Sequence, residues 1–236
     1  MNRYDKDDII TMSDTAFDGK AGIAEIMRIF QSAVTQHTHL LGVDAPAVYK
    51  KLGAKWVITR IRFEIDKRLH VGDEYTVSTW PLEAKPLRFG RSFVISTKDG
   101  TAVRAYSDWC LLDAKTDAVI RSSRLSMPID EYLTDTVTES KFSMAKGEFT
   151  ADDALFSRTM RVSDIDLNRH VNNISYIKLA LDCFSANELD ALDIKSFEMY
   201  YVSQCYEGDT LTLYRNGSCI EARCGADTVF RCTVNL

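Results

Sequence analysis

A short polar stretch, SDIDLNRHVNN, concentrates side chains that can hydrogen-bond or exchange protons at residues 163–173. Within it, Asp166, Asn168 and His170 lie two residues apart. In an extended or irregular segment this spacing turns the three side chains to the same side. A carboxylate, an amide and an imidazole gathered in this way suit the hydrolysis of an ester or a thioester.

An apolar run follows directly, so a helix is expected to begin just after this stretch. The first backbone N–H groups of a helix have no partner within it, and those near Val171 and Asn172 would stabilise a developing oxyanion. A purely structural cap is the alternative, because Asp, Asn and Ser are the usual residues at helix N-termini.

A comparison within the chain favours chemistry over capping. Ser13 and Asp14 precede the first helical stretch, just as Ser163 and Asp164 precede the second helical stretch. Counted from there, the equivalents of Asp166, Asn168 and His170 are Ala16, Asp18 and Lys20. A cap required by the architecture would be expected in both places, so one chemically equipped site on a duplicated scaffold is the simplest interpretation.

Hydrophobic periodicity divides the chain into two similar halves. Residues 21–41 repeat apolar side chains at steps of three and four, which predicts a helix. A loop containing Gly42, Pro46 and Gly53 follows. Apolar and polar residues then alternate in WVITRIRFEI, which predicts a half-buried antiparallel strand. Further strands are expected at residues 75–80, 91–97 and 102–112. The second half repeats this order with a strand at 154–162, a helix at about 171–184 and strands at 196–203, 210–214, 218–223 and 229–234.

We therefore predict an α+β protein with two tandem units, each a long helix wrapped by an antiparallel sheet, which is the double hotdog arrangement. The expected boundaries are residues 1–130 for the N-terminal unit, 131–147 for a solvated linker and 148–236 for the C-terminal unit.

Composition places further limits on function. The chain has 236 residues, a net charge of −5 and six cysteines without a CxxC pair, so neither a zinc site nor a disulfide framework is indicated. No apolar run is long enough for a membrane helix, and the acidic N-terminus is unlike a signal peptide. We expect a cytoplasmic protein that binds no nucleic acid, membrane, metal or cofactor and that is a monomer or a homodimer.

Several stretches of the sequence resemble those of a known protein family. The stretch SDIDLNRHVNNISYI is similar to a motif of the fatty acyl-ACP thioesterases, the plant plastid enzymes and their bacterial relatives. The likeness extends to FDGKA before the first helix, QSA and His37 within it, the strand WVITRIRFEI, and the pairs Thr79-Trp80 and Asp108-Trp109. The resemblance implies hydrolysis of the thioester between a fatty acyl chain and acyl carrier protein, which releases free fatty acid and ends chain elongation.

The resemblance also implies roles for individual residues. Asp166, Asn168 and His170 match catalytic positions. The family carries a Glu-Cys pair on the following strand, where this chain has Gln204 and Cys205. Because a glutamine cannot accept a proton from water, His170 or Asp166 would be the general base.

Three mechanisms stay open at this stage. In the preferred one, Asp166 orients His170 to activate water while Asn168 and backbone N–H groups near Val171 and Asn172 hold the thioester oxygen. Attack by a carboxylate to form an anhydride is the second, and attack by Cys205 is the third. A buried strand cysteine with no chemical role is the alternative for Cys205.

Two surfaces complete the prediction. The first helix, with Ile23, Met27, Phe30 and Val34, is expected to line an acyl pocket. Residues 50–104 carry 12 basic and 6 acidic side chains in an otherwise acidic chain, so this segment is the expected docking side for acidic acyl carrier protein. The candidate docking residues are Lys50, Lys51, Arg88 and Arg91.

Other functions are compatible with the same scaffold. These are a thioesterase for acyl-CoA, a non-catalytic acyl-binding module, and a hotdog dehydratase. A dehydratase would need a carboxylate from the helix of the other unit, where this chain offers only Glu25.

Overall fold

The computed structural model describes residues 1–135, 137–138, 142–143 and 147–235. The chain divides into two compact units, Met1–Lys141 and Phe142–Leu236, called unit 1 and unit 2 below. Part of the predicted linker, at residues 136, 139–141 and 144–146, lies outside the described residues, and the described remainder of 131–147 forms neither helix nor strand. In the described part of the chain, no helix has the length and apolar character needed to cross a bilayer.

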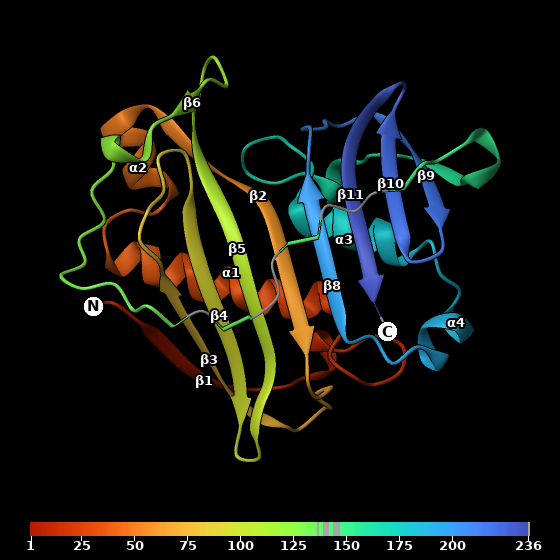
Figure 1. The fold of residues 1–236 in the computed structure, drawn as a ribbon, viewed down its shortest axis with the longest axis horizontal. Coiled ribbons are helices and arrows are strands. Elements are labelled where there is room, and N and C mark those ends of the chain that lie inside the picture. Colours follow the sequence, from red (N-terminus) through yellow and green to blue (C-terminus); the bar gives the residue numbers. More distant parts are fainter. Residues whose placement is uncertain (136, 139–141, 144–146, 236) are drawn as a thin grey trace. The chain divides into compact units, whose positions relative to one another are not determined.

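Unit 1 is built on an antiparallel sheet with the strand order β1-β3-β4-β5-β2, and a short strand, β6, pairs with β5 (Figure 1). The strands are β1 Tyr4–Ile9, β2 Ala54–Ile65, β3 Glu74–Pro81, β4 Phe89–Thr97, β5 Gly100–Asp113 and β6 Val119–Ile120. The remaining elements are the 3-10 turns η1 Met12–Asp14 and η2 Ser122–Arg124 and the helices α1 Ile23–Leu40 and α2 Ala45–Leu52. The helix and the four strands expected in this half are therefore present.

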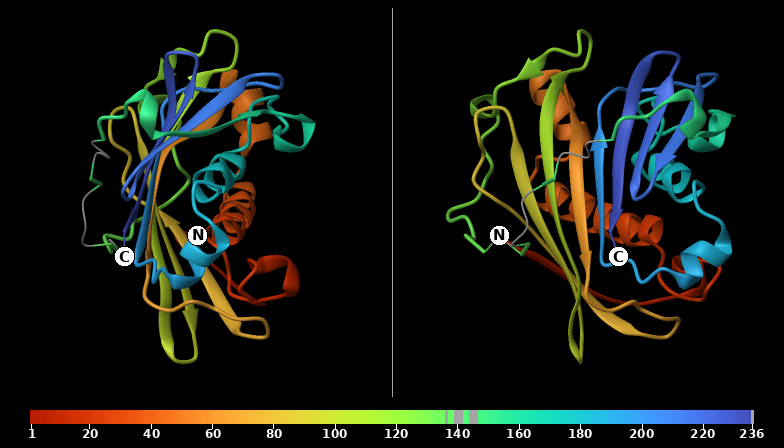
Figure 2. Two further views of the ribbon diagram at one scale, coloured as in Figure 1. Left: turned by 90° about the vertical axis from the view of Figure 1, so that its right-hand side faces the viewer. Right: turned by 45° about the vertical axis from the view of Figure 1, so that its right-hand side comes forward.

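The core of unit 1 lies between α1 and its sheet, and Figure 2 shows from the side that α1 keeps to one face of that sheet. Phe30 of α1 packs against Phe63 of β2 and Phe93 of β4, with ring centroids 5.8 and 4.8 Å apart. All three rings are almost completely buried. The apolar stripe that predicted α1 is thus the face that packs on the sheet.

The predicted loop after α1 contains a helix, α2. Asp44 caps it by accepting a hydrogen bond from the backbone N–H of Ala47 at 2.9 Å, Pro46 lies in its first turn, and Gly53 ends it in the left-handed conformation. A cap residue, an early proline and a terminal glycine are ordinary helix boundaries. The prediction of a loop was wrong here because Pro46 and Gly53 lie at the two ends of a helix, where both residue types are as common as they are in turns.

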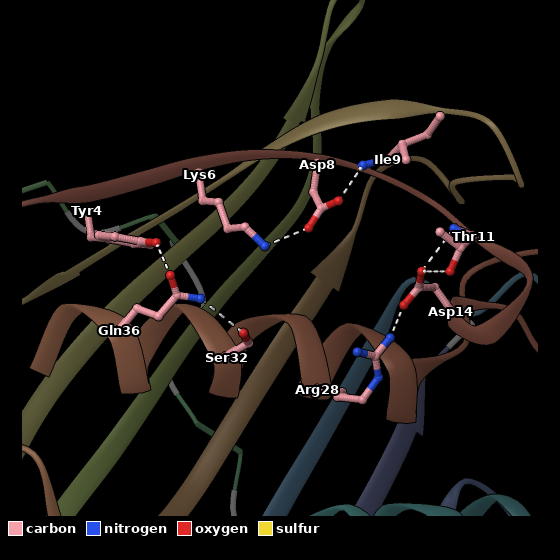
Figure 3. Close-up of polar contacts among 9 residues, drawn as sticks. All are labelled: Tyr4, Lys6, Asp8, Ile9, Thr11, Asp14, Arg28, Ser32 and Gln36. Carbon is pink, nitrogen blue, oxygen red and sulfur yellow. Dashed lines mark hydrogen bonds and ion pairs between the residues drawn. The ribbon is translucent and has the colours of Figure 1, made fainter. Parts of the chain in front are cut away.

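Strand β1 was not predicted, since its sequence YDKDDI lacks an apolar face. It pairs with β3 as an edge strand of the sheet of unit 1. Figure 3 shows that polar side chains link the N-terminal segment to α1. Tyr4 donates to Gln36 at 2.6 Å, and Arg28 of α1 forms an ion pair with Asp14. Charged side chains on an edge strand also discourage pairing with another chain.

Unit 2 has the same plan with a shorter helix. Its antiparallel sheet has the order β8-β11-β10-β9-β7, and α3 lies against one face of it (Figure 2). Its strands are β7 Ala154–Thr159, β8 Ser196–Tyr201, β9 Thr210–Asn216, β10 Cys219–Cys224 and β11 Asp227–Asn235. The 3-10 turns η3 Ala151–Asp153 and η4 Val162–Asp164 and the helices α3 Asn173–Leu181 and α4 Ala186–Ala191 complete it. The α+β class with two helix-and-sheet units is therefore confirmed.

Candidate active site

The polar stretch singled out in the sequence forms a closed turn before α3. A β-bridge between Ile165 and Val171 joins the two ends of the turn. Inside it, the backbone N–H of Asp166 donates to the carbonyl of His170 at 2.8 Å, and that of Arg169 donates to the carbonyl of Asp166 at 3.0 Å. Arg169 takes a left-handed conformation with φ of 63°, which a non-glycine residue adopts at a cost. The turn therefore fixes the backbone of all three candidate catalytic residues.

Asp166 holds this turn from within. Its Oδ1 accepts hydrogen bonds from the backbone N–H groups of Asn168 at 2.8 Å and of His170 at 3.3 Å. The carboxylate thus orients His170 through its main chain.

A second aspartate, Asp164, attaches the turn to the strand before it and to α3. Its side chain accepts hydrogen bonds from the backbone N–H of Arg161 at 2.9 Å and from Nη2 of Arg158 at 2.7 Å, and its carbonyl accepts one from the N–H of Asn172 at 2.7 Å. Asp164 is only 5% exposed. Asp164 was not singled out as a functional residue, although its recurrence as Asp14 in the first half was a visible sign of its structural role.

The expectation that the backbone N–H groups of Val171 and Asn172 hold the oxyanion needs correction. Their backbone N–H groups are already used, by the carbonyl of Cys205 at 2.9 Å and by that of Asp164. Asn172 is instead the N-cap of α3, and its Oδ1 accepts from the N–H of Ile174 at 2.9 Å. The first residue of α3, Asn173, has a backbone N–H that none of the hydrogen bonds of the described residues uses, so it is available as an oxyanion donor in their place.

Gln204 and Cys205 lie in the loop between β8 and β9 rather than on a strand. The hydrogen bond from Val171 N–H to the Cys205 carbonyl places this loop directly beside the turn of residues 165–171. This turn carries the three candidate catalytic residues and is called the catalytic turn below. In the same loop, the ring of Tyr206 contacts that of His170 at a centroid distance of 5.1 Å and an angle of 68°. The sequence pattern did not single out Tyr206, because the contact joins segments far apart along the chain.

The thiol of Cys205 is poorly suited to act as a nucleophile. Cys205 is 1% exposed, and burial raises the pKa of its thiol to about 11. Its backbone N–H donates to the hydroxyl of Tyr176, at 3.1 Å. The geometry therefore favours the interpretation of Cys205 as a packed cysteine whose backbone positions the loop.

Unit 1 contains a copy of this turn with different side chains. The N–H of Ala16 donates to the carbonyl of Lys20 at 2.8 Å, and that of Ala21 donates to the carbonyl of Leu69 at 2.7 Å. Gly19, with φ of 73°, takes the left-handed position of Arg169. These main-chain hydrogen bonds, together with that from Gly19 N–H to the Ala16 carbonyl at 3.1 Å, have direct counterparts in unit 2, so Ala16, Asp18 and Lys20 are the structural equivalents of Asp166, Asn168 and His170.

Ion pairs replace the candidate catalytic groups in unit 1. Oδ2 of Asp18 lies 3.6 Å from Nζ of Lys20 and 3.7 Å from Nη2 of Arg68, and Arg68 occupies the position of Gln204. The side chain of Asp18 is 9% exposed. A carboxylate paired with two cations is a poor candidate for activating water, so among the described residues the candidate active site lies in unit 2.

The candidate acyl-pocket residues lie on the sheet-facing side of α1. Ile23, Met27 and Phe30 are buried, and Val34 is half-buried. The candidate docking residues differ among themselves: Lys50, Lys51 and Arg88 are exposed, whereas Arg91 is only 5% exposed. Arg91 is therefore removed from the docking surface, because its side chain points into the interior.

Arg91 instead forms a buried pair with His37 of α1. Nη1 of Arg91 donates to Nδ1 of His37 at 3.1 Å and to Oγ1 of Thr79 at 3.2 Å. Burial lowers the pKa of Arg91 to about 9, and burial together with the Arg91 charge lowers the pKa of His37 to about 4. His37 is therefore a neutral residue of the core. Among the described residues, no group of three or more His, Cys, Asp or Glu is arranged to hold a metal ion.

Comparisons with known proteins identify the family of the chain. The family model described as "Acyl-ACP thioesterase N-terminal domain" matches residues 1–124, and "Acyl-ACP thioesterase C-terminal domain" matches residues 150–232. The chain belongs to the acyl-ACP thioesterase family.

Similar relatives include the chloroplastic acyl-[acyl-carrier-protein] hydrolase FATB3 of Cuphea viscosissima, 26% identical over 206 residues, which cover 82% of this chain and 50% of the relative. A palmitoyl-acyl carrier protein thioesterase of Arabidopsis thaliana is 26% identical over 201 residues, covering 80% of this chain and 48% of the relative. The chain thus spans about half the length of the curated relatives it matches.

Solved structures share the fold. An acyl-ACP thioesterase from Bacteroides thetaiotaomicron superposes with a TM-score of 0.86 at 23% identity, covering 98% of this chain and 96% of that one. The 12:0-ACP thioesterase from Umbellularia californica gives 0.83 at 19% identity, covering 99% and 96%. The predicted double hotdog fold is therefore confirmed.

Proposed function

We propose that the chain hydrolyses the thioester of fatty acyl-ACP, releasing free fatty acid and ending chain elongation. The observation that carries this proposal is the Asp166, Asn168 and His170 turn at the start of α3, present in one unit and replaced by ion pairs on the same backbone in the other. Membership of the acyl-ACP thioesterase family supports the choice of substrate. The cytoplasmic location and the monomeric or dimeric state remain predictions.

In the proposed mechanism, His170 removes a proton from the attacking water. Asp166 positions the backbone of His170 by holding the main chain of the turn. The side chain of Asn168 and the N–H of Asn173 stabilise the oxyanion, and a thiolate leaves with little need for an acid. Gln204 lies beside the turn and orients the water or the carbonyl.

Turnover of purified protein tests the proposal. Acyl-ACP and acyl-CoA carrying the same acyl chain are compared by the release of free thiol and free fatty acid. We expect hydrolysis with a clear preference for acyl-ACP. Alanine at His170 is expected to lower kcat by about 10²–10⁴-fold, as for removal of a general base.

A matched control uses the equivalent residue of unit 1. Lys20→Ala changes the same position of the same turn, and we expect kcat close to that of the unchanged protein. Full activity of His170→Ala would contradict the mechanism, a preference for acyl-CoA would contradict the substrate, and retention of acyl-ACP without release of acid would indicate a binding module.

The apolar face of α1 is the proposed wall of the acyl pocket, since Met27 and Phe30 face the sheet of unit 1. Met27→Phe adds volume there and is expected to shift hydrolysis toward shorter chains. Fatty acids that accumulate in bacteria expressing each variant provide the measurement, and an unchanged chain-length profile would remove α1 from the pocket.

The proposed partner, acyl carrier protein, is acidic, and unit 1 presents a matching cationic end. The turn at Lys85–Arg88 is held against η2 by a hydrogen bond from Ser122 N–H to the Pro86 carbonyl at 3.0 Å. Both segments border a small core that also supports α2 and contains Val48, Phe89 and Leu125. We define the docking patch as the exposed basic residues on these segments: Lys50, Lys51, Lys85, Arg88, Arg121 and Arg124.

A further inference from the structure

Tyr206 places an aromatic ring against the candidate catalytic histidine. The two ring centroids lie 5.1 Å apart and the ring planes cross at 68°, an edge-to-face geometry that aromatic pairs prefer. Tyr206 is 48% exposed even though it belongs to a loop that packs on the catalytic turn. The ring therefore lies at the surface beside His170 instead of filling the core.

The backbone around Tyr206 is fixed on both sides. Cys205 donates its N–H to the hydroxyl of Tyr176 at 3.1 Å and accepts from the N–H of Val171 at 2.9 Å. The N–H of Tyr206 donates to Oδ2 of Asp209 at 2.8 Å, and its carbonyl accepts from the N–H of Asp209 at 3.2 Å. The loop therefore holds the base of the aromatic side chain in place next to the turn.

Fixing the backbone of His170 does not by itself set the rotation of its imidazole about the two side-chain bonds. Asp166 fixes the main chain of His170 but its described hydrogen bonds do not reach the ring. A ring packed edge-to-face against the imidazole restricts that rotation and so favours one orientation of its nitrogens. General-base catalysis depends on such an orientation, because the base must lie within hydrogen-bond reach of the proton it removes.

The equivalent position in unit 1 supports a specific role. His70 occupies the place of Tyr206, since the N–H of His70 donates to Oδ2 of Asp73 at 2.9 Å as that of Tyr206 does to Asp209. Its neighbour across the turn is Lys20, in the place of His170, and the two are joined by a backbone bridge. The same backbone is thus kept without the aromatic pair, so the fold of the loop does not require a tyrosine.

We propose that Tyr206 is a positioning residue for His170, holding the imidazole by ring contact in the orientation that activates water. The inference rests on the proposed function, in which His170 is the general base. It assigns the effect to the aromatic ring and none to the hydroxyl group.

Kinetics of two substitutions separate ring from hydroxyl. Tyr206→Leu removes the ring and is expected to lower kcat for acyl-ACP by about 10-fold with KM unchanged, in proportion to the energy of an aromatic pair. Tyr206→Phe keeps the ring and is expected to restore kcat to within about 2-fold. His70→Leu, the matched change in unit 1, is expected to leave kcat unchanged.

NMR of the His170 side chain gives a readout independent of turnover. In the unchanged protein and in Tyr206→Phe we expect the same imidazole orientation, and in Tyr206→Leu a changed orientation or averaging among several, with the same circular dichroism for all. An unchanged orientation in Tyr206→Leu, a loss in Tyr206→Phe equal to that in Tyr206→Leu, or a rise in KM at constant kcat would overturn the proposal. Should the unchanged protein fail to hydrolyse acyl-ACP, the proposed function fails, and the NMR comparison still decides whether Tyr206 positions His170.

Discussion

Inside unit 1, the imidazole of His37 makes the stability of the protein depend on pH. Burial, together with the Arg91 charge, lowers the pKa of His37 to about 4 from its usual value of 6.5. As pH falls below about 6.5, the unfolded chain binds a proton that the folded protein does not accept until about pH 4. The contribution of neutral His37 to the free energy of unfolding is therefore fully present above about pH 6.5. Up to about 3 kcal/mol of it is lost as pH falls to about 4.

His37→Asn tests this effect, because asparagine does not titrate and its side-chain oxygen keeps an acceptor for Arg91. We expect the free energy of unfolding of the variant to fall less steeply with decreasing pH than that of the unchanged protein. Urea denaturation between about pH 7 and pH 4 measures both slopes. Parallel slopes would mean that other groups dominate acid denaturation.

Cys205 permits a second test at the residue scale. Because its thiol is buried and its pKa is raised to about 11, we expect it to react with iodoacetamide at least about 10-fold more slowly than the half-buried Cys219 and Cys224. Mass spectrometry of the alkylated native protein measures the three rates. Unfolding in urea should make them similar, and rapid native labelling of Cys205 would reopen its role as a nucleophile.

At the scale of elements, the 3-10 turns before α1 and α3 have the same anchor. Asp14 accepts hydrogen bonds from Thr11 and pairs with Arg28, as Asp164 accepts from Arg161 and pairs with Arg158. Both carboxylates are nearly buried. Each variant, Asp14→Asn or Asp164→Asn, is expected to lose about 1–3 kcal/mol of stability.

The two variants should differ in activity. Only Asp164 lies next to the catalytic turn, so kcat is expected to fall in Asp164→Asn and to stay unchanged in Asp14→Asn. Thermal unfolding gives the stabilities, and turnover measured well below the melting temperatures gives the activities. Equal kcat in the two variants would show that the turn of unit 2 does not depend on this anchor.

Periodicity predicted most of these elements because each of them has one apolar face. Strand β2 and helix α1 follow this rule, and their observed bounds lie within two residues of the expected ones at each end. Strand β1 has polar residues on both faces, and α2 consists of eight residues with a proline, so neither gives a clear period. The second helix was predicted too long because Cys183 and Phe184 continue the apolar pattern, although α3 ends at Leu181.

The candidate site was predictable only in part. Asp166, Asn168 and His170 are neighbours in sequence, and their spacing was sufficient to find them. The contacts of Tyr206, the use of the Val171 and Asn172 N–H groups, and the burial of Arg91 depend on segments that meet only after folding. A positive charge in a strand gives no sign of which face of the sheet it occupies.

At the scale of the whole molecule, charge is unevenly distributed. The net charge is −5, yet the docking patch gathers exposed cations. Within the described residues, five of the six form no ion pair, and the sixth, Arg88, lies 3.6 Å from the buried Asp108. These charges are therefore available to an acidic partner.

Charge reversal measures this attraction. Arg121→Glu combined with Arg124→Glu is expected to raise KM for acyl-ACP by about 10-fold at low salt, with kcat unchanged and a smaller effect at high salt. The control variant reverses the charges of Lys67 and Lys98, which changes the net charge by the same amount. Lys98 lies beyond the far end of β4, about 30 Å from Arg88 along the strand. An equal rise in KM for both pairs would indicate a general charge effect without a defined docking patch.

The duplicated turn also has a consequence for protein engineering. In unit 1 the main chain of residues 16–20 already follows the path that presents the candidate catalytic side chains in unit 2, with Gly19 supplying the left-handed position at no steric cost. Grafting new chemistry there requires side-chain replacement alone, with no loop redesign. Unit 1 thus offers a second, preformed backbone for an engineered site, and the candidate site of unit 2 keeps its own residues.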